Sequence, residues 1–210
     1  MSKVNALIIR FIFSAILLLA CAAARAENAG VVVATTGDSY ALSAAKQKRP
    51  LKRGAAIFTG DTLMTGGDAK LLIRMADNTA VAIHENSEYK VDQYHYDPSN
   101  SASNINHASF VKGSMRVLTG AISKDHPEKY ELRTPVAVIG VRGTEFSVSF
   151  HCVGNGGTDN CRLVVLDRHG LVVVTNNGGS TTLTPGRYTE VHNHNQAPRS
   201  MVAPSKNLCF

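Results

Sequence analysis

The chain has 210 residues, a length that fits one domain or one domain with a short appendage. Its composition, 44% hydrophobic and 18% charged, excludes a disordered or fibrous protein. There is no Trp and only 6% of residues are aromatic, so the chain has little material for stacking nucleic-acid bases. The formal charge of +6 includes Lys3, Arg10 and Arg25 of a segment predicted to be removed. The 19 basic side chains that remain, against 16 acidic ones, indicate solubility rather than nucleic-acid or membrane binding.

The first 26 residues have the organisation of a signal peptide. Lys3 and Arg10 give a positive start, an uncharged apolar run extends from Phe11 to Ala24, and Ala24-Arg25-Ala26 has the small-x-small form of a cleavage site. We therefore predict cleavage before Glu27. The apolar run is shorter than the roughly 20 residues that a membrane-spanning helix needs, so no membrane span is expected after cleavage.

A lipoprotein signal is the alternative for the same segment. In Leu18-Leu19-Ala20-Cys21, Cys21 would be lipidated and would become the mature N-terminus. Leu19 fits that pattern poorly, whereas the Ala-x-Ala site fits well. Export to the periplasm or the cell surface is favoured, and anchoring through Cys21 stays open.

Export makes disulfides chemically permissible, and Cys152 and Cys161 are placed to form one. They bracket the turn formers of residues 153–160, and strand-like sequence flanks both, so the pair would close a hairpin-like loop. A loop of about ten residues corresponds to roughly 2–3 kcal/mol of stabilisation. The spacing matches no zinc site, and neither a metal nor a cofactor is expected. Cys209 has no partner in the sequence.

The elements of the first half are short strands separated by turns. Two strands between residues 30 and 42 flank Gly37-Asp38, and strands at 71–75 and 79–83 flank Ala76-Asp77-Asn78. Between these hairpins, the basic stretch from Lys46 to Arg53 is predicted to be a solvated loop, with a contact for an anionic glycan or lipid as the alternative. Residues 88–94 form a further strand. Residues 97–107 form a polar loop inside the same domain.

The second half contains the clearest strand pattern. Residues 136–141 are apolar at both odd-numbered and even-numbered positions, as expected for a strand covered on both faces. Through residues 146–151, hydrophobic and polar residues alternate. Strands at 163–166 and 171–175 are joined by a turn at 167–170, and a flexible tail begins at His192. The sequence thus predicts one all-β domain over residues 27–191, built of many short strands as a β-solenoid-like fold or a double-layered sheet.

Two stretches together resemble the FecR-like domain family. They are Leu51-Lys52-Arg53-Gly54 with Phe58-Thr59-Gly60-Asp61-Thr62-Leu63-Met64-Thr65-Gly66, and Arg133-Thr134-Pro135-Val136-Ala137-Val138-Ile139-Gly140-Val141-Arg142-Gly143-Thr144-Glu145-Phe146. The resemblance implies an extracytoplasmic all-β module for sensing or interaction. The regulator that gives the family its name begins with a cytoplasmic segment that contacts a sigma factor. Because a signal peptide is predicted directly before the β domain here, direct sigma-factor contact is not expected, and the chain resembles the free-standing secreted members.

The motif residues are predicted to serve the architecture. Gly140 and Gly143 are expected to adopt backbone angles unfavourable for other residues, or to allow a close approach of another strand. Arg142 is expected to satisfy carbonyls exposed where the strand turns, with a partner's carboxylate as the alternative. Thr144 is expected to make a local hydrogen bond. The remaining motif positions predicted to be structural are Thr134, Pro135, Gly60 and Asp61.

Motifs for catalysis or metal binding are missing from the sequence. Asp61 and Asp77 are predicted to form Asx turns rather than a calcium site, and His192 and His194 to be surface residues rather than metal ligands. There is no nucleophile elbow, His-Glu-x-x-His or phosphate loop, although only the fold would reveal a pair of carboxylates. We expect a non-enzymatic module that binds an envelope protein or a cell-wall polysaccharide in envelope signalling. The alternative is a wall-associated structural or adhesion protein, lectin-like in character.

Overall fold

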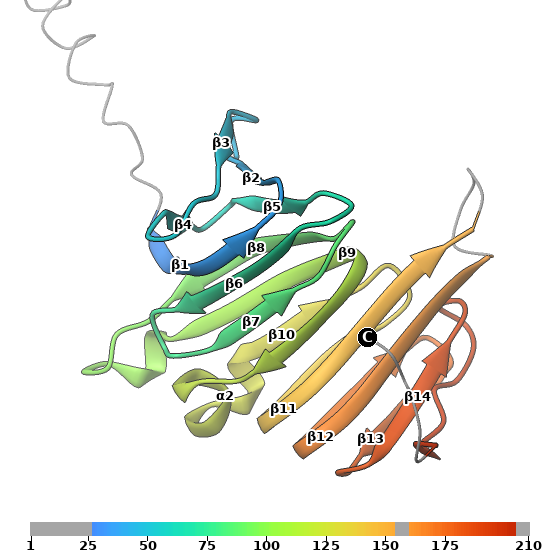
Figure 1. Ribbon diagram of the computed structural model, residues 1–210. Helices are drawn as coiled ribbons and strands as arrows, with labels where there is room; N and C mark the ends of the chain where they lie inside the picture. Colours follow the sequence, from blue (N-terminus) through green and yellow to red (C-terminus); the bar gives the residue numbers. More distant parts are fainter. Residues whose placement is uncertain (1–26, 154–159, 205–210) are drawn as a thin grey trace, which may run out of the picture.

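The computed structural model describes residues 27–153 and 160–204, and strands make up most of that part of the chain (Figure 1). Its helical elements are short: α2 (Ala121–Asp125), η1 (Ser101–Ser103) and η2 (Pro127–Lys129). The strands are β1 (Asn28–Thr36), β2 (Ser39–Leu42), β3 (Lys48–Pro50), β4 (Ala56–Phe58), β5 (Thr62–Thr65), β6 (Lys70–Met75), β7 (Ala80–Ile83), β8 (Glu88–His95), β9 (Ile105–Leu118), β10 (Tyr130–Arg133), β11 (Val138–Cys152), β12 (Cys161–Asn176), β13 (Gly179–Leu183), β14 (Arg187–Val191) and β15 (Met201–Val202). The predicted all-β fold class is confirmed. The predicted signal peptide, residues 1–26, lies outside the described residues.

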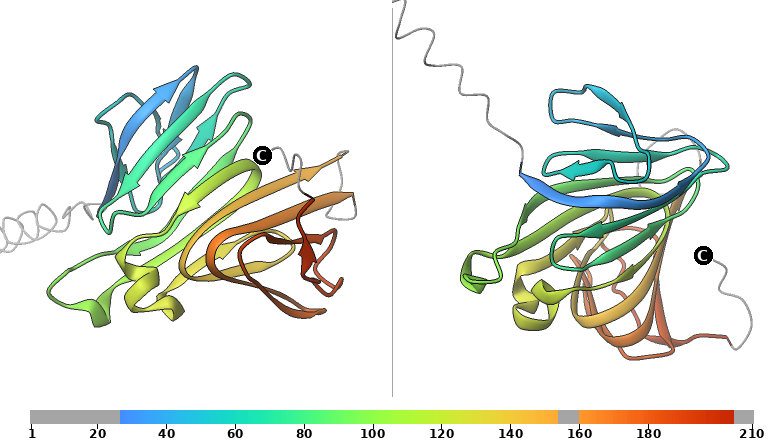
Figure 2. Two further views of the ribbon diagram at one scale, coloured as in Figure 1. Left: turned by 60° about the horizontal axis from the view of Figure 1, so that its bottom comes forward. Right: turned by 60° about the vertical axis from the view of Figure 1, so that its left-hand side comes forward.

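The described strands form one hydrogen-bonded sheet organised around the long strand β9. On one side, the first half of β9 pairs with β8 and its second half with β7. On the other side, the first half pairs in parallel with β10 and the second half antiparallel with β11. From β9 one arm continues through β7 and β6 to β1, and the other through β8 and β5 to β2 (Figure 2). Both arms contribute to one buried core, so this part of the sheet is double-layered.

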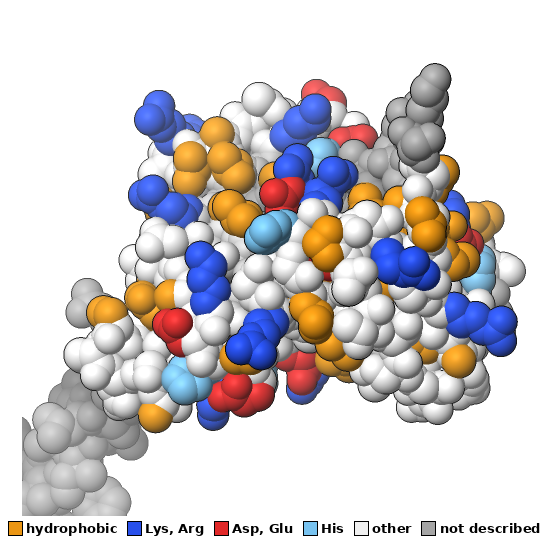
Figure 3. All heavy atoms as spheres, turned by 90° about the horizontal axis from the view of Figure 1, so that it is seen from below, with side chains coloured by type: hydrophobic (Ala, Val, Ile, Leu, Met, Phe, Trp, Pro, Cys, Tyr) orange, Lys and Arg blue, Asp and Glu red, His pale blue; other side chains and the backbone are white. Residues whose placement is uncertain are grey.

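Alternating side chains explain how the strands build that core and leave a surface on which charged and hydrophobic side chains are interspersed, as the face in Figure 3 shows. In β6, Leu71, Ile73 and Met75 are buried, while Lys70 and Arg74 are exposed. This period of two places one face of the strand against the opposite arm and leaves the other face in water. The strand–turn–strand pattern around residues 76–78 predicted this strand and the next, and alternation predicted the strand at residues 88–94.

β11 and β12 form the longest hairpin, and both strands bend at one place, which we call the corner and define as residues 142–145 and 167–170. Register shifts lie between Arg142 and Glu145, and Arg142 still pairs with Leu171 and Glu145 with His169. The predicted turn at 167–170 is therefore a bulge within one strand. Before the corner β11 pairs with β10, and after the corner it pairs with β9. The bend therefore changes which strand lies beside β11.

The prediction that residues 136–141 are covered on both faces is wrong in part. Val136, Ile139 and Val141 are buried, but Val138 is 38% exposed. The strand begins only at Val138, where its outward face meets water. A short apolar run does not reveal how many of its faces will be covered, because this depends on distant elements.

The predicted flexible tail covers residues 192–210, of which 205–210 lie outside the described residues; residues 192–204 lie against the sheet. β15 pairs antiparallel with β14, and the backbone N–H of Asn177 donates to the carbonyl of His194 at 3.0 Å. Arg187 Nε also donates to Ser200 Oγ at 2.6 Å. In the described part of the chain, no helix has the length and apolar character that crossing a bilayer requires.

Candidate functional site

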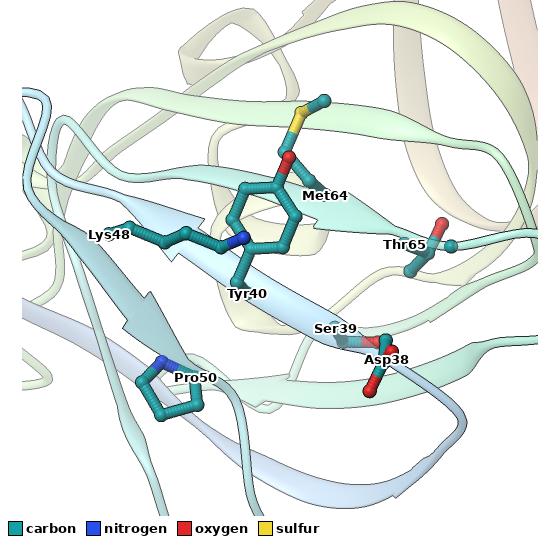
Figure 4. Close-up of a pocket in the computed structure, with 8 residues that line it drawn as sticks. Asp38, Ser39, Tyr40, Lys48, Pro50, Met64 and Thr65 are labelled. Carbon is teal, nitrogen blue, oxygen red and sulfur yellow. The ribbon is translucent and has the colours of Figure 1, made fainter.

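An open groove of about 640 Å³ lies on the outer face of β2, β3 and β5, and we call it the hairpin groove (Figure 4). Tyr40 stands at its centre, because register places Tyr40 opposite Pro50 on β3 and opposite Met64 on β5. Side chains directly opposite each other on neighbouring strands contact one another. The groove residues are Asp38, Ser39, Tyr40, Lys48, Pro50, Met64, Thr65 and Gly66.

The Lys48 ammonium lies over the Tyr40 ring, with Nζ 4.0 Å from the ring centroid (Figure 4). Such a cation–π contact restricts the side chain while leaving its N–H donors available to a ligand. Lys48 takes part in none of the ion pairs between described residues. The groove therefore presents a positioned positive charge at the edge of an apolar floor.

The hydroxyl groups of Ser39 and Thr65 are engaged in the fold. Thr65 Oγ1 donates to the carbonyl of His84 at 2.6 Å and accepts from the N–H of Ser87 at 2.9 Å. Ser39 is buried and accepts a hydrogen bond from Thr35. Among the groove residues there is neither a pair of carboxylates nor a nucleophile beside a base. This arrangement is suited to binding.

Asp61 and Gly60 lie next to the groove and protect the edge of β4. Asp61 Oδ2 lies 2.5 Å from Arg49 Nη2 and accepts the N–H of Phe58 at 3.0 Å. Arg49 Nη1 donates to the carbonyl of Ala56 at 2.8 Å. The pair satisfies backbone groups that an unpaired strand edge would expose. Asp61 thus forms an ion pair instead of the predicted Asx turn, and Gly60 has a positive φ of 88°.

Sequence reasoning missed this role of Arg49, because Arg49 was one charge among several in the basic stretch. Its partner lies 12 residues away on another element. Tyr40 and Lys48 were missed as individual groove residues. The only signal was the excess of basic residues from Lys46 to Arg53, for which an anionic glycan or lipid contact was the alternative explanation.

The second family motif builds the corner. Gly143 has a φ of 56°, and a Cβ atom on Gly170 would lie 2.5 Å from the Gly143 carbonyl oxygen. Thr144 donates its N–H to Thr119 Oγ1 at 2.8 Å, and the N–H of Thr119 donates to the carbonyl of Thr144 at 2.9 Å. These contacts lock the bend against the end of β9. The motif is thus part of the scaffold.

The start of the motif closes a turn before β11. Thr134 Oγ1 donates to the carbonyl of Ala137 at 2.8 Å and accepts the N–H of Ala137 at 3.1 Å. Pro135 occupies the exposed tip of this turn. The hydroxyl of Thr134 therefore replaces the strand pairing that the turn interrupts.

The expectations for Gly140, Arg142 and the Thr144 hydroxyl are not met: Thr144 Oγ1 is buried and has no hydrogen-bond partner among the described residues. Gly140 has no positive φ, and a Cβ atom there would meet nothing within 4 Å. Arg142 is exposed, and no hydrogen bond or ion pair joins its guanidinium to another described residue. The Thr144 carbonyl of the bend is satisfied by Thr119 rather than by Arg142.

Cys152 and Cys161 form the predicted disulfide, which closes the far end of the β11–β12 hairpin. His192 Nε2 lies 3.0 Å from Glu190 Oε1, and its Nδ1 lies 3.1 Å from the carbonyl oxygen of Cys161, so its ring contacts these groups rather than His194. No group of three or more His, Cys, Asp or Glu side chains in residues 27–153 and 160–204 is arranged to hold a metal ion.

Asp77 and Asp167 are fully buried. Asp77 forms the expected Asx turn, since Oδ1 accepts the N–H of Thr79 at 3.1 Å; Oδ1 also accepts the hydroxyl of Tyr94 at 3.1 Å. Burial and the Asp77 charge raise the pKa of Tyr94 above its usual value. In contrast, neither carboxylate oxygen of Asp167 has a well-formed hydrogen bond to a described residue, and burial raises the pKa of this carboxyl, with His169 and its backbone N–H opposing the rise.

Residues 61–168 match the family described as "FecR protein". Two crystal structures of a "putative anti-sigma factor" from Parabacteroides distasonis ATCC 8503 have a similar fold, with a TM-score of 0.51 each and 18% and 17% sequence identity. The match covers 68% of this chain and 59% of theirs, so the chain spans well under two thirds of those proteins. A "cell surface anchoring domain" aligns over 30% of this chain and 82% of its own, with 34% identity and a TM-score of 0.29. No curated protein matches the chain.

Proposed function

This chain belongs to the FecR protein family, and on that premise we propose that it is a non-enzymatic binding module of the cell envelope. Its task is to recognise an envelope protein or a cell-wall polysaccharide as part of envelope signalling. The hairpin groove is the binding site. The observation that carries the proposal is this open groove on a rigid sheet, with a positioned Lys48 and no reactive set of side chains.

Two further observations support the proposal. A disulfide at the tip of a hairpin is typical of proteins that fold outside the reducing cytoplasm, which supports the periplasm or the cell surface as the location. The solved structures of similar fold are named for an anti-sigma factor, which supports a regulatory role. Direct sigma-factor contact is not part of the proposal.

Capture of partners from envelope extract tests the function. Immobilised wild-type protein should retain a discrete partner that Tyr40→Ala loses and Tyr188→Ala keeps. Tyr188 is the matched control because it is a half-buried tyrosine of β14, outside the hairpin groove. If nothing is retained, or if both variants retain the same material, the groove is not the binding site.

A transcriptional measurement separates signalling from the structural alternative. Cells that lack the protein should change the expression of a defined gene set, and wild-type protein should restore it while Tyr40→Ala should not. A wall-associated adhesion protein would bind purified cell wall and leave transcription unchanged, which would contradict the proposal.

The location is tested by fractionation with mass spectrometry of the mature N-terminus. A soluble form that begins at Glu27 is expected in the periplasmic or secreted fraction. An acylated Cys21 would instead place the groove at a membrane surface. Recovery of the uncleaved chain from the cytoplasm would contradict an envelope role.

A further inference from the structure

We propose that the hairpin groove binds an acidic polysaccharide, with a sugar carboxylate on the Lys48 ammonium and a sugar ring on the apolar floor. The inference rests on the proposed function, because it names the ligand class for the same site. Lys48, Tyr40 and Asp38 are the residues that determine this preference.

The charged side chains of β3 and its flanking segments are all positive, while Asp38 lines the groove and Glu88 stands opposite Met64 on β8. Lys46, Lys52 and Arg53 are exposed on the segments that flank β3, and like Lys48 they form no ion pair with a described residue. Arg49 differs, because Asp61 neutralises it inside the scaffold. The remaining cations favour a ligand with repeated negative charges over a neutral one.

The floor of the groove suits a sugar ring. Pro50, Tyr40 and Met64 form a row across three strands and provide apolar surface for the C–H face of a ring. Asp38 is exposed at the other end of the groove from Lys48, where its carboxylate can accept hydroxyl donors (Figure 4). A volume of about 640 Å³ accommodates a short oligosaccharide segment.

An acidic peptide that adds a strand is disfavoured at both neighbouring edges. The N–H of Leu51 donates to Ser39, and the N–H of Ser43 donates to Gln47, so residues 48 and 50 direct their backbone groups outward from β3. Pro50 has no N–H to offer there. The edge of β4 is occupied by Arg49 and Asp61. A ligand is therefore recognised by the side chains on the face of the groove. That face offers no row of unpaired backbone N–H and C=O groups with which a peptide strand could pair.

Titration with fluorescently labelled oligosaccharides tests the inference. A polyuronate oligosaccharide should bind wild-type protein at about 0.15 M salt, and a dextran oligosaccharide of equal length should not. Lys48→Gln should weaken polyuronate binding at least tenfold. Lys124→Gln removes the same charge from exposed α2, outside the groove, and should change binding less than twofold.

A second pair of variants tests the floor. Tyr40→Ala should weaken binding at least tenfold, and Tyr40→Phe should retain it because the ring is kept. Circular dichroism melting checks that each variant is folded, and the Lys48→Gln result stands independently should Tyr40→Ala unfold.

Four outcomes would overturn the inference. These are no binding of polyuronate, equal binding of dextran, equal losses for Lys48→Gln and Lys124→Gln, and tighter groove-dependent binding of polyglutamate. If partner capture still depends on Tyr40 while polyuronate fails to bind, the ligand class is wrong and the proposed function stands. If neither depends on the groove, both are wrong.

Discussion

The β6–β7 turn and the corner each contain a fully buried aspartate, but the hydrogen bonding of the two carboxylates differs. In the turn, Asp77 accepts hydrogen bonds from Thr79 and Tyr94, and its Oδ2 also accepts the N–H of Ile122 at 3.4 Å. In the corner, neither oxygen of Asp167 has a well-formed hydrogen bond to a described residue, and only the His169 backbone N–H and charge oppose the effect of burial on its pKa.

The difference has a structural origin. A tight turn leaves backbone N–H groups without strand partners, and a carboxylate inside the turn can accept hydrogen bonds from them. A bulge within a paired strand keeps most N–H groups in the ladder, so few donors remain for Asp167. The β6–β7 turn is therefore anchored to α2, whereas the corner contains a buried group that reduces stability.

The largest effect is expected for Asp77→Ala. It leaves the Thr79 N–H, the Tyr94 hydroxyl and the Ile122 N–H without an acceptor, and should reduce the free energy of unfolding by roughly 3 kcal/mol or more. Denaturant unfolding measures the loss. Asp125→Ala, at the exposed end of α2, is the control. A similar small loss for both variants would remove the distinction between the two regions.

Gly170→Ala should destabilise the corner by roughly 2 kcal/mol. Gly170 has a φ of 99°, and the added Cβ would lie 2.5 Å from a backbone oxygen, which can move only if β11 moves. Thermal unfolding measures the change. An unchanged melting temperature would show that the two strands do not meet as tightly as described.

Asp167→Asn should stabilise the protein by on the order of 1 kcal/mol at pH 7, because it removes an unpartnered buried charge. Burial raises the pKa of Asp167 in the folded state above its usual value of 3.8. The folded state therefore binds the proton more tightly, and ionisation costs stability as the pH rises through the folded pKa.

The stabilisation by Asp167→Asn should accordingly shrink as the pH falls toward 3.8, where the wild-type carboxyl becomes protonated. Unfolding of both proteins at pH 7 and pH 4 checks this. A variant less stable than wild type at pH 7 would mean that Asp167 is satisfied, and the contrast with Asp77 would fail.

The smallest effect is expected for Gly140→Ala, within about 0.5 kcal/mol of wild type. The position has no positive φ and its Cβ would meet no neighbour. Comparison with Gly170→Ala tests whether glycine is required only at the corner or at every glycine position of the motif. A loss equal to that of Gly170→Ala would contradict this.

The sequence by itself determined the local structure. Alternation predicted that Phe146, Val148 and Phe150 share one buried face, and all three are buried. Turn formers predicted the hairpin around Asp77, and the spacing of Cys152 and Cys161 predicted their disulfide. These features depend on the two-residue period of a strand and on the preferences of turn residues, which a short stretch of sequence contains in full.

Only the tertiary structure decided which strands meet and what the charged groups contact. It placed Arg49 on Asp61, made residues 167–170 a bulge in one strand, and left Val138 and Arg142 facing water. It also assembled the hairpin groove from three strands. Strand pairing joins residues far apart in the chain, and a local pattern fixes the two faces of a strand but not the element that covers each face.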